Sequence, residues 1–200
     1  MTIKNPNHPK KGSTTKVGPI RKIQDIKAII KLLHDKPKEQ LLFTLGVNNG
    51  LRAGDLLLLQ VKQVKHLKTG DTLEITESKT GKKNVFIVNK TVKKYLSRYL
   101  AYKELDDDSY LFFSQKQKDQ PICISHVNRL VKSWCKAINL KGNYGAHTLR
   151  KTWGYIKRTR DGVGFEVIAK RFNHSNPSIT MRYLGIQDKE VYSALMDDIC

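Results

Sequence analysis

The sequence is poor in features that would point to a secreted, metal-binding or membrane protein. Its 200 residues include only three cysteines, Cys123, Cys135 and Cys200, which are widely spaced and form no CxxC pair. A disulfide framework or a zinc site is therefore not expected, and a reducing, cytoplasmic location fits. No stretch approaches the roughly 20 consecutive apolar residues that span a bilayer. The first residues contain no apolar run typical of a secretory signal.

Acidic residues are also scarce. Lys and Arg number 37 against 18 Asp and Glu, so the formal net charge is +19. This excess favours a polyanionic partner, because each neutralised phosphate releases counterions. We expect double-stranded DNA as the partner and a nucleoid-associated protein. A merely basic protein is the open alternative. A membrane surface is disfavoured, because no basic segment combines a strong apolar face with a lipidation motif.

The chain is expected to form one domain preceded by an arm. Residues 1–21 contain several prolines, glycines and lysines and no acid. We predict a basic flexible arm there, which either lies along a DNA backbone or is simply an unstructured terminus. Hydrophobic residues make up 39% of the sequence, which is enough for a packed core over residues 22–200.

Hydrophobic periodicity predicts helices around a small sheet. Apolar residues recur at helical spacing over 26–33 and 125–138. Two β-rich runs, 72–76 and 85–88, flank a basic turn and predict a hairpin. Residues 64–67 are considered as a third strand. The expected fold class is α+β, mainly helical, with a small antiparallel sheet.

The side chains that could carry out chemistry suit the cleavage of a phosphodiester by a route that uses no metal ion. The acidic run Asp106–Asp108 is contiguous and polar, which is typical of a solvated loop rather than a two-metal site. A phosphodiester can instead be held by Arg, Lys and His around a side-chain nucleophile. His147 and Arg150 lie three residues apart, so a helix would present both on one face. The complete candidate set is Arg52, Lys79, His147, Arg150, His174 and Tyr183.

In this order and spacing, the set resembles the tyrosine recombinase (phage integrase) family over residues 22–195. The resemblance rests on a Gly-Leu-Arg segment ending at Arg52, a hairpin lysine, a His-x-x-Arg box at 147–150, and a tyrosine nine residues after His174. It implies that family's catalytic-domain fold. It also implies DNA strand cleavage and rejoining without a metal, ATP or another cofactor.

The resemblance assigns a role to each residue. Tyr183 would attack the scissile phosphate and form a 3′-phosphotyrosyl linkage. Arg52 and Arg150 would hold the non-bridging oxygens, which suits the planar guanidinium. His174 would donate a further hydrogen bond to the phosphate, and Lys79 would protonate the leaving 5′ oxygen.

The remaining roles concern proton transfer and support. The resemblance implies that His147 assists proton transfer involving Tyr183, and that Asp55, three residues after Arg52, orients the site. Lys82 and Lys83 compete with Lys79 for the role of acid. The alternative tyrosines are Tyr144, Tyr155 and Tyr192, and the nine-residue spacing favours Tyr183 over them. Residues expected to contact the DNA backbone are Lys82, Lys83, Lys151, Lys157, Arg158 and Arg160.

The sequence departs from the family pattern in three places. Lys151 stands where a His often follows the Arg, which is expected to adjust phosphate contacts. Phe172-Asn173 replaces the usual Leu-Gly before His174. Asn tolerates the left-handed conformation that Gly would adopt, so the turn is expected to survive. The helical core-binding domain that precedes many family catalytic domains is missing, so the chain is either a short recombinase or an excised fragment.

Three functions are compatible with these features. The first is a site-specific recombinase that works as a homo-tetramer on two DNA sites, with a monomer considered for the DNA-free state. The second is relaxation of supercoils by a type IB topoisomerase-like enzyme, and the third is a DNA-binding regulator without strand exchange. An apolar stripe predicts a last helix over about 188–199. This helix would dock either on a neighbouring protomer or on its own domain.

Overall fold

The computed structural model describes residues 16–116, 119–185, 192–193 and 195–196. The expected arm at 1–21 and the last helix at 188–199 therefore lie largely outside the described residues. No helix within the described ranges is long and apolar enough to cross a bilayer. The elements are α1 (Ile23–Leu32), α2 (Pro37–Asn49), α3 (Ala53–Leu57), α4 (Val61–Val64), β1 (Thr72–Thr76), β2 (Lys83–Ile87), α5 (Lys90–Tyr102), α6 (Ile124–Ala137), α7 (Ala146–Thr159), α8 (Phe165–Arg171) and α9 (Pro177–Leu184).

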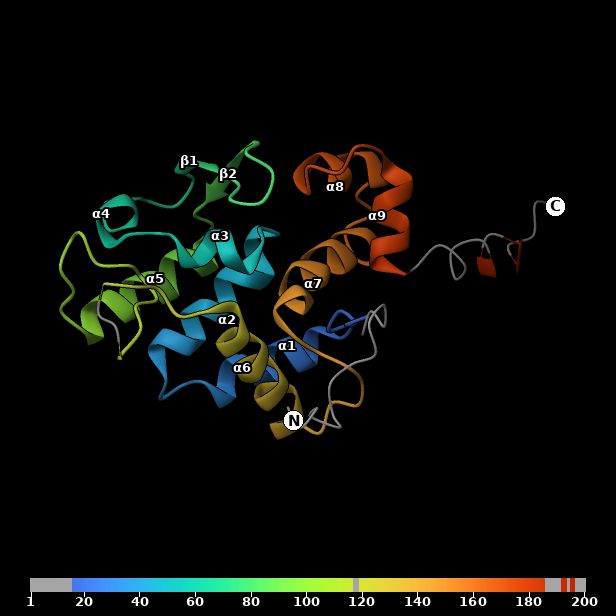
Figure 1. The fold of residues 1–200 in the computed structure, drawn as a ribbon. Helices are drawn as coiled ribbons and strands as arrows, with labels where there is room; N and C mark the ends of the chain where they lie inside the picture. Colours follow the sequence, from blue (N-terminus) through green and yellow to red (C-terminus); the bar gives the residue numbers. More distant parts are fainter. Residues whose placement is uncertain (1–15, 117–118, 186–191, 194, 197–200) are drawn as a thin grey trace, which may run out of the picture.

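Helix α2 forms the centre of the molecule (Figure 1). Pro37 occupies its first turn, where the missing N–H costs nothing. Most of its residues are buried, and it packs against α5 and α7. Gly46 allows the closest approach to α7, since an added Cβ would lie 2.6 Å from Cδ1 of Leu149. This contact sets the position of the N-terminal half of α7.

The sheet has two strands among the described residues. β1 and β2 pair antiparallel, with Thr72 opposite Ile87 and Thr76 opposite Lys83, so the predicted hairpin is confirmed. The third strand considered over 64–67 is wrong. Val64 instead ends the short helix α4, at whose start Gln60 N donates to Gln63 Oε1 at 2.9 Å, and a turn follows. Local capping therefore prevails over the β propensity of the valines.

Two hydrophobic clusters flank the functional region. The larger cluster lies among α1–α6 and includes Leu149 on α7. The smaller one consists of Phe165, Ile168, Phe172 and Leu184 beneath α8 and α9. Helix α7 runs from the first cluster to the second. Its first turns, which carry the His-x-x-Arg box, therefore lie near the junction of the two clusters (Figure 1).

The two helices predicted from hydrophobic periodicity agree closely with the structure. The helix expected over 125–138 runs from Ile124 to Ala137. The helix expected over 26–33 belongs to α1, Ile23–Leu32. The predicted fold class, mainly helical α+β with a small antiparallel sheet, is confirmed.

Candidate functional site

Tyr183 and His147 meet across two helices. Tyr183 lies on α9 and His147 in the first turn of α7, and the tyrosine hydroxyl is 3.4 Å from Nδ1 of His147. Burial raises the pKa of Tyr183 to about 12, although Arg150 and Arg52 act to lower it. Partial desolvation, followed by the charge of Arg150, lowers the pKa of His147. At neutral pH the phenol is therefore protonated, and the neutral imidazole has a nitrogen that can accept a proton.

Arg150 is held in place by Phe172. Its Nη2 donates to the backbone carbonyl of Phe172 at 2.6 Å, and its Cζ lies 4.5 Å from the centroid of the Phe172 ring. The same ring contacts Tyr183 edge-on, with centroids 5.6 Å apart. Burial lowers the pKa of Arg150 to about 10, so the guanidinium stays charged at neutral pH. Phe172 thus fixes the arginine and the tyrosine relative to each other.

His174 lies beside the same aromatic group. Its ring centroid is 5.5 Å from that of Tyr183, and its Nδ1 is 2.8 Å from Thr180 Oγ1. Desolvation, followed by the charges of Arg150 and Arg52, lowers its pKa to about 4. Asn173, the residue before it, has φ 52°, so Asn adopts the left-handed conformation that the sequence analysis expected.

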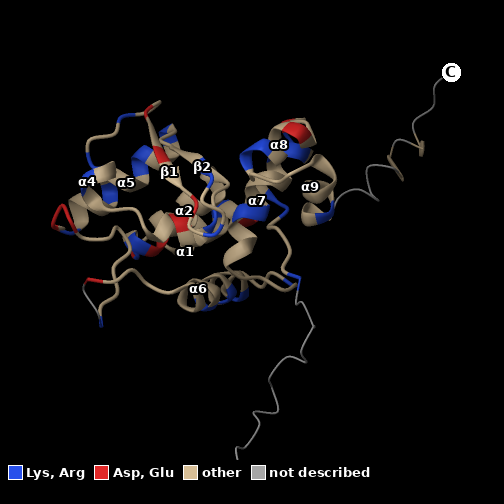
Figure 2. Cartoon of the chain, turned by 45° about the horizontal axis from the view of Figure 1, so that its top comes forward, with Lys and Arg blue, Asp and Glu red and all other residues tan. Residues whose placement is uncertain are grey.

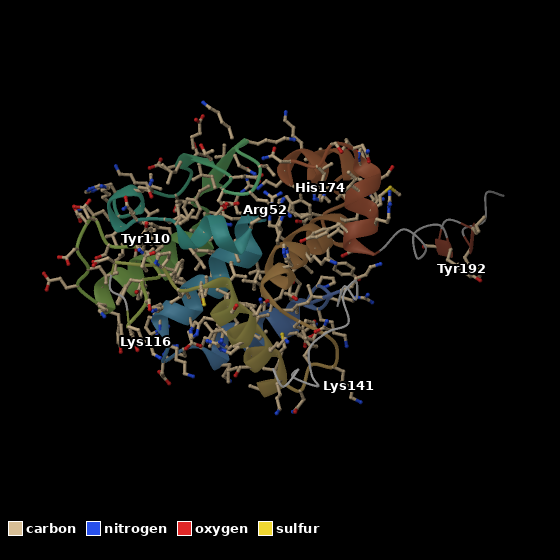
Figure 3. All side chains as sticks on the ribbon, viewed as in Figure 1. Arg52, Tyr110, Lys116, Lys141, His174 and Tyr192 are labelled. Atoms are coloured by element: carbon tan, nitrogen blue, oxygen red, sulfur yellow. The ribbon has the colours of Figure 1, made fainter. Side chains whose placement is uncertain are left out.

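Arg52 adds a second positive charge to this group, because it lowers the pKa of His174 and acts to lower that of Tyr183. It is the residue that precedes α3, and its side chain is 19% exposed. Figure 3 shows Arg52 and His174 near each other in this view, with Arg52 before α3 and His174 between α8 and α9. The carboxylate of Glu77 pairs with Arg52 and lies 3.9 Å from Nη1 of Arg150. The structure therefore brings both predicted arginines to one carboxylate.

Asp55 and Lys79 are connected through the hairpin turn. Oδ1 of buried Asp55 accepts hydrogen bonds from the backbone N of Ser78 at 2.9 Å and from its hydroxyl at 2.8 Å. Lys79 follows in the exposed turn. Its positive charge contributes to the lowered pKa of His147. Asp55 thus contacts the turn that carries Lys79.

The other two hairpin lysines differ from Lys79 in their surroundings. Lys83 pairs with Glu74 at 2.8 Å on the exposed side of the strands. Lys82 is exposed in the turn. Neither Lys82 nor Lys83 is among the charges that lower the pKa of His147, which favours Lys79 over these two as the hairpin lysine that acts at the site.

Two residues that the sequence reasoning missed join the hairpin to the rest of the site. Glu77 is buried at the base of the turn. Arg171 donates to the carbonyl of Asn49, to Asn84 Oδ1 at 2.9 Å and to the carbonyl of Val85 at 2.6 Å, so it links α8 to α2 and β2. One feature of the sequence could have indicated Glu77. It lies two residues before Lys79, and no other acidic residue follows it until Glu104. Arg171 had no comparable signal.

The predicted DNA-backbone residues have different surroundings. Lys151 Nζ lies 4.6 Å from the centroid of the Tyr183 ring, which places it at the site. Lys157 and Arg160 both pair with Asp161, at 2.8 Å and 2.6 Å. Arg158 lies over the ring of Phe165.

Basic residues are spread over many elements, including α7 and α8, and one group of acidic residues lies in the loop beside α4 (Figure 2). In that loop, Asp107 and Asp108 pair with Lys65 and Lys62. The run Asp106–Asp108 therefore lies in a lysine-paired surface loop. Within the described part of the chain, no group of three or more His, Cys, Asp or Glu side chains could hold a metal ion.

Comparison with known proteins agrees with this arrangement. The sequence matches the phage integrase family over residues 22–190. YoeC of Bacillus subtilis (strain 168), named a probable integrase/recombinase, is 38% identical over 181 residues, 89% of this chain and 94% of that protein. Tyrosine recombinase XerC of Caldanaerobacter subterraneus subsp. tengcongensis is 29% identical over 80% of this chain and 44% of that protein. The chain spans about half the length of three of its curated relatives.

Solved structures share the fold. The crystal structure of XerA recombinase superimposes with a TM-score of 0.70 at 19% identity, covering 90% of this chain and 66% of that chain. XerH recombinase, in a post-cleavage complex with palindromic difH substrate, gives 0.69 at 16% identity, covering 91% and 53%. The family match, the close relative and the shared fold agree. The chain belongs to the phage integrase family, whose members are tyrosine-type site-specific DNA recombinases.

Proposed function

We propose that this chain cuts and rejoins double-stranded DNA at specific sites through a 3′-phosphotyrosyl intermediate on Tyr183. The observation that carries the proposal is the contact between the Tyr183 hydroxyl and Nδ1 of His147, 3.4 Å apart, beside buried Arg150. Attack on an anionic phosphodiester requires a nucleophile, a proton acceptor and a fixed positive charge. Tyr183, His147 and Arg150 would supply these three in turn.

The cleavage step then follows from these groups. The Tyr183 oxygen attacks the phosphorus, its proton passes to Nδ1 of His147, and the bond from phosphorus to the 5′ oxygen breaks. Lys79 gives a proton to that leaving oxygen, which becomes a 5′-hydroxyl. In the reverse step, a 5′-hydroxyl attacks the phosphotyrosyl linkage and returns its proton to Lys79, and the bond from phosphorus to Tyr183 breaks as His147 gives its proton back to the tyrosine oxygen. Each step exchanges one phosphodiester for another, so rejoining needs no ATP and we propose no metal or other cofactor.

The other residues act on the charge of the phosphate. Arg52 and Arg150 reach the non-bridging oxygens, where a planar guanidinium makes two parallel hydrogen bonds. The hydrogen bond between His174 Nδ1 and Thr180 Oγ1 leaves Nε2 as the nitrogen that can donate to the phosphate. Asp55 supports the site through Ser78, next to Lys79. Lys82, Lys83, Lys151, Lys157, Arg158 and Arg160 serve as contacts to the DNA backbone.

The proposal extends to organisation and assembly. Residues 22–200 form the catalytic domain, residues 1–21 act as a basic arm, and four copies act on two DNA sites. The solved XerH structure is a complex with its DNA substrate. That complex and the +19 net charge of this chain support DNA as the partner.

A suicide substrate tests the chemistry. The protein is incubated in EDTA with labelled, nicked duplexes carrying candidate sites, so that the short cleaved fragment diffuses away and the adduct accumulates. A covalent band is expected for the wild type and for Tyr192→Phe, and none for Tyr183→Phe. Tyr192 is a suitable control because it is 74% exposed and lies far from Arg52 and His174 (Figure 3).

Two results would overturn the proposal. One is tight binding to a cognate site with no covalent band, which would indicate a DNA-binding regulator. The other is a band that persists in Tyr183→Phe. Joining of two different duplexes separates a recombinase from a topoisomerase-like enzyme, which would relax supercoils without exchanging strands.

A further inference from the structure

Glu77 is a charged side chain that is completely buried inside the candidate site. It follows β1, at the base of the turn that carries Lys79, and its side chain is 0% exposed. Hydrogen bonds from Thr80 and Asn84 and the pairing with Arg52 outweigh the effect of burial and lower its pKa to about 2. Burying an ionised carboxylate carries a desolvation penalty, which only favourable interactions with its partners can offset. The partners of Glu77 therefore indicate what the buried charge does.

Its first set of partners is the pair of arginines proposed to hold the phosphate. Oε2 of Glu77 pairs with Nη1 of Arg52, and Oε1 lies 3.9 Å from Nη1 of Arg150. The two guanidinium groups and one carboxylate carry a net charge of +1. A phosphodiester contributes one negative charge, so this group of three is complementary to a single scissile phosphate.

Its second set of partners belongs to the hairpin. Oε2 accepts a hydrogen bond from the Thr80 hydroxyl at 2.6 Å, and Oε1 accepts one from Asn84 Nδ2 at 2.9 Å. The backbone of Glu77 also closes the turn, with its N donating to the carbonyl of Lys82 at 2.9 Å. One carboxylate therefore joins the turn that carries Lys79 to the two arginines.

We propose that Glu77 is a positioning residue that orients Arg52 and the Lys79 turn together around the scissile phosphate. This inference rests on the proposed function. A carboxylate on one edge of a guanidinium fixes its plane and leaves its other N–H groups to bind oxygen anions. Because a misplacement of about 1 Å can cost about 10²-fold in rate, Glu77 contributes to cleavage without touching the DNA.

The test compares Glu77→Gln with a matched control, Glu74→Gln. Gln keeps the size of the side chain and one oxygen that can accept from Thr80, but it removes the charge that aligns Arg52 and replaces the oxygen that accepts from Asn84 with an amide nitrogen. Glu74 lies on β1, three residues before Glu77, and its exposed side chain pairs with Lys83. At saturating protein on the nicked substrate, we expect Glu77→Gln to form the adduct about 10- to 100-fold more slowly, less than the loss typical of removing a donor outright. DNA affinity should stay within about twofold, as expected for a transition-state effect, and Glu74→Gln should match the wild type.

A double-mutant cycle separates positioning from general structural support. If Glu77 acts through Arg52, then Glu77→Gln should slow cleavage much less in an Arg52→Ala background than in the wild type. A merely structural role would give the same fold-loss in both backgrounds. Thermal unfolding of every variant shows that folded protein is compared.

Glu77→Asp provides a second variant if Glu77→Gln does not fold. Asp keeps the negative charge, but its side chain is one methylene shorter and places the carboxylate farther from Arg52. We therefore expect folded protein with a cleavage rate between those of the wild type and Glu77→Gln. If Glu77→Gln fails to fold, Glu77→Asp is expected to cleave more slowly than the wild type at unchanged DNA affinity.

The inference is overturned if the folded Glu77 variants cleave at the wild-type rate, since Glu77 would then have no positioning role. It is also overturned if they cleave faster, since Glu77 would then compete with the phosphate for Arg52. Failure of the wild type to form an adduct would instead contradict the proposed function.

Discussion

The hydroxyl of Tyr183 lies 3.4 Å from Nδ1 of His147, although the two residues are separated by 36 positions. The contact joins α9 to the first turn of α7. The pKa of Tyr183 is raised to about 12 and that of His147 is lowered. The phenol is therefore protonated at neutral pH, and the imidazole beside it is neutral and can accept the phenolic proton.

Replacement of His147 by Asn should slow adduct formation at pH 7 by about 10²-fold, the lower end of what general base catalysis contributes. The loss should shrink above pH 9, because hydroxide can then remove the phenolic proton. Single-turnover cleavage rates across this pH range provide the measurement. His66→Asn, in the exposed turn after α4, is the control. If His147→Asn slows cleavage by the same factor at every pH, His147 does not act as the proton acceptor.

Lys79→Ala and Lys82→Ala distinguish between two neighbouring lysines of the hairpin turn. On an ordinary substrate, Lys79→Ala should cleave at least about 10²-fold more slowly, because the 5′ oxygen leaves poorly without a proton. A substrate with sulfur in place of that 5′ oxygen needs no acid, because a thiolate leaves readily. Lys79→Ala should therefore recover on the sulfur substrate, whereas Lys82→Ala should behave as the wild type on both. Recovery of Lys82→Ala instead would identify Lys82 as the acid.

His174 should make folding stability depend on pH. Its pKa is about 4 in the folded protein, against an ordinary value of 6.5. The unfolded chain therefore binds more protons between these values, and stability falls as the pH drops from 6.5 towards 4. His147 acts in the same direction. Urea unfolding at pH 7 and pH 5 should show a smaller loss of stability for His174→Gln than for the wild type. Equal losses would mean that other groups cause the pH dependence.

Asp161→Asn should strengthen DNA binding. Asp161 pairs with Lys157 and Arg160, and these hydrogen bonds keep its pKa well below the ordinary range. Removal of the charge frees both basic side chains for phosphate contacts. Each added contact should steepen the slope of log affinity against log salt by about 0.9. Titrations at several salt concentrations measure this, and an unchanged slope would show that Lys157 and Arg160 do not contact DNA.

Local patterns in the sequence were sufficient to predict the hairpin and the main helices. The alternation over 72–76 and the apolar spacing over 26–33 depend only on neighbouring residues, and both segments adopt the expected structure. The left-handed turn at Asn173 was predictable for the same reason, because Asn tolerates a positive φ. The prediction of a third strand was wrong because the hydrogen bond from Gln60 N to Gln63 Oε1 stabilises the start of α4 instead.

The sequence was sufficient to propose which residues belong to the candidate site. It did not predict the hydrogen bonds and ion pairs that connect these residues. The resemblance to the tyrosine recombinase family predicted Arg52, His147, Arg150, His174 and Tyr183 as site residues, and phosphate chemistry explains why these side-chain types would be useful there. The carboxylate of Glu77 and the links made by Arg171 appear only once β1, β2 and α8 lie together. Hydrogen bonds and ion pairs act over a few ångströms, so their partners are decided by tertiary packing rather than by distance along the chain.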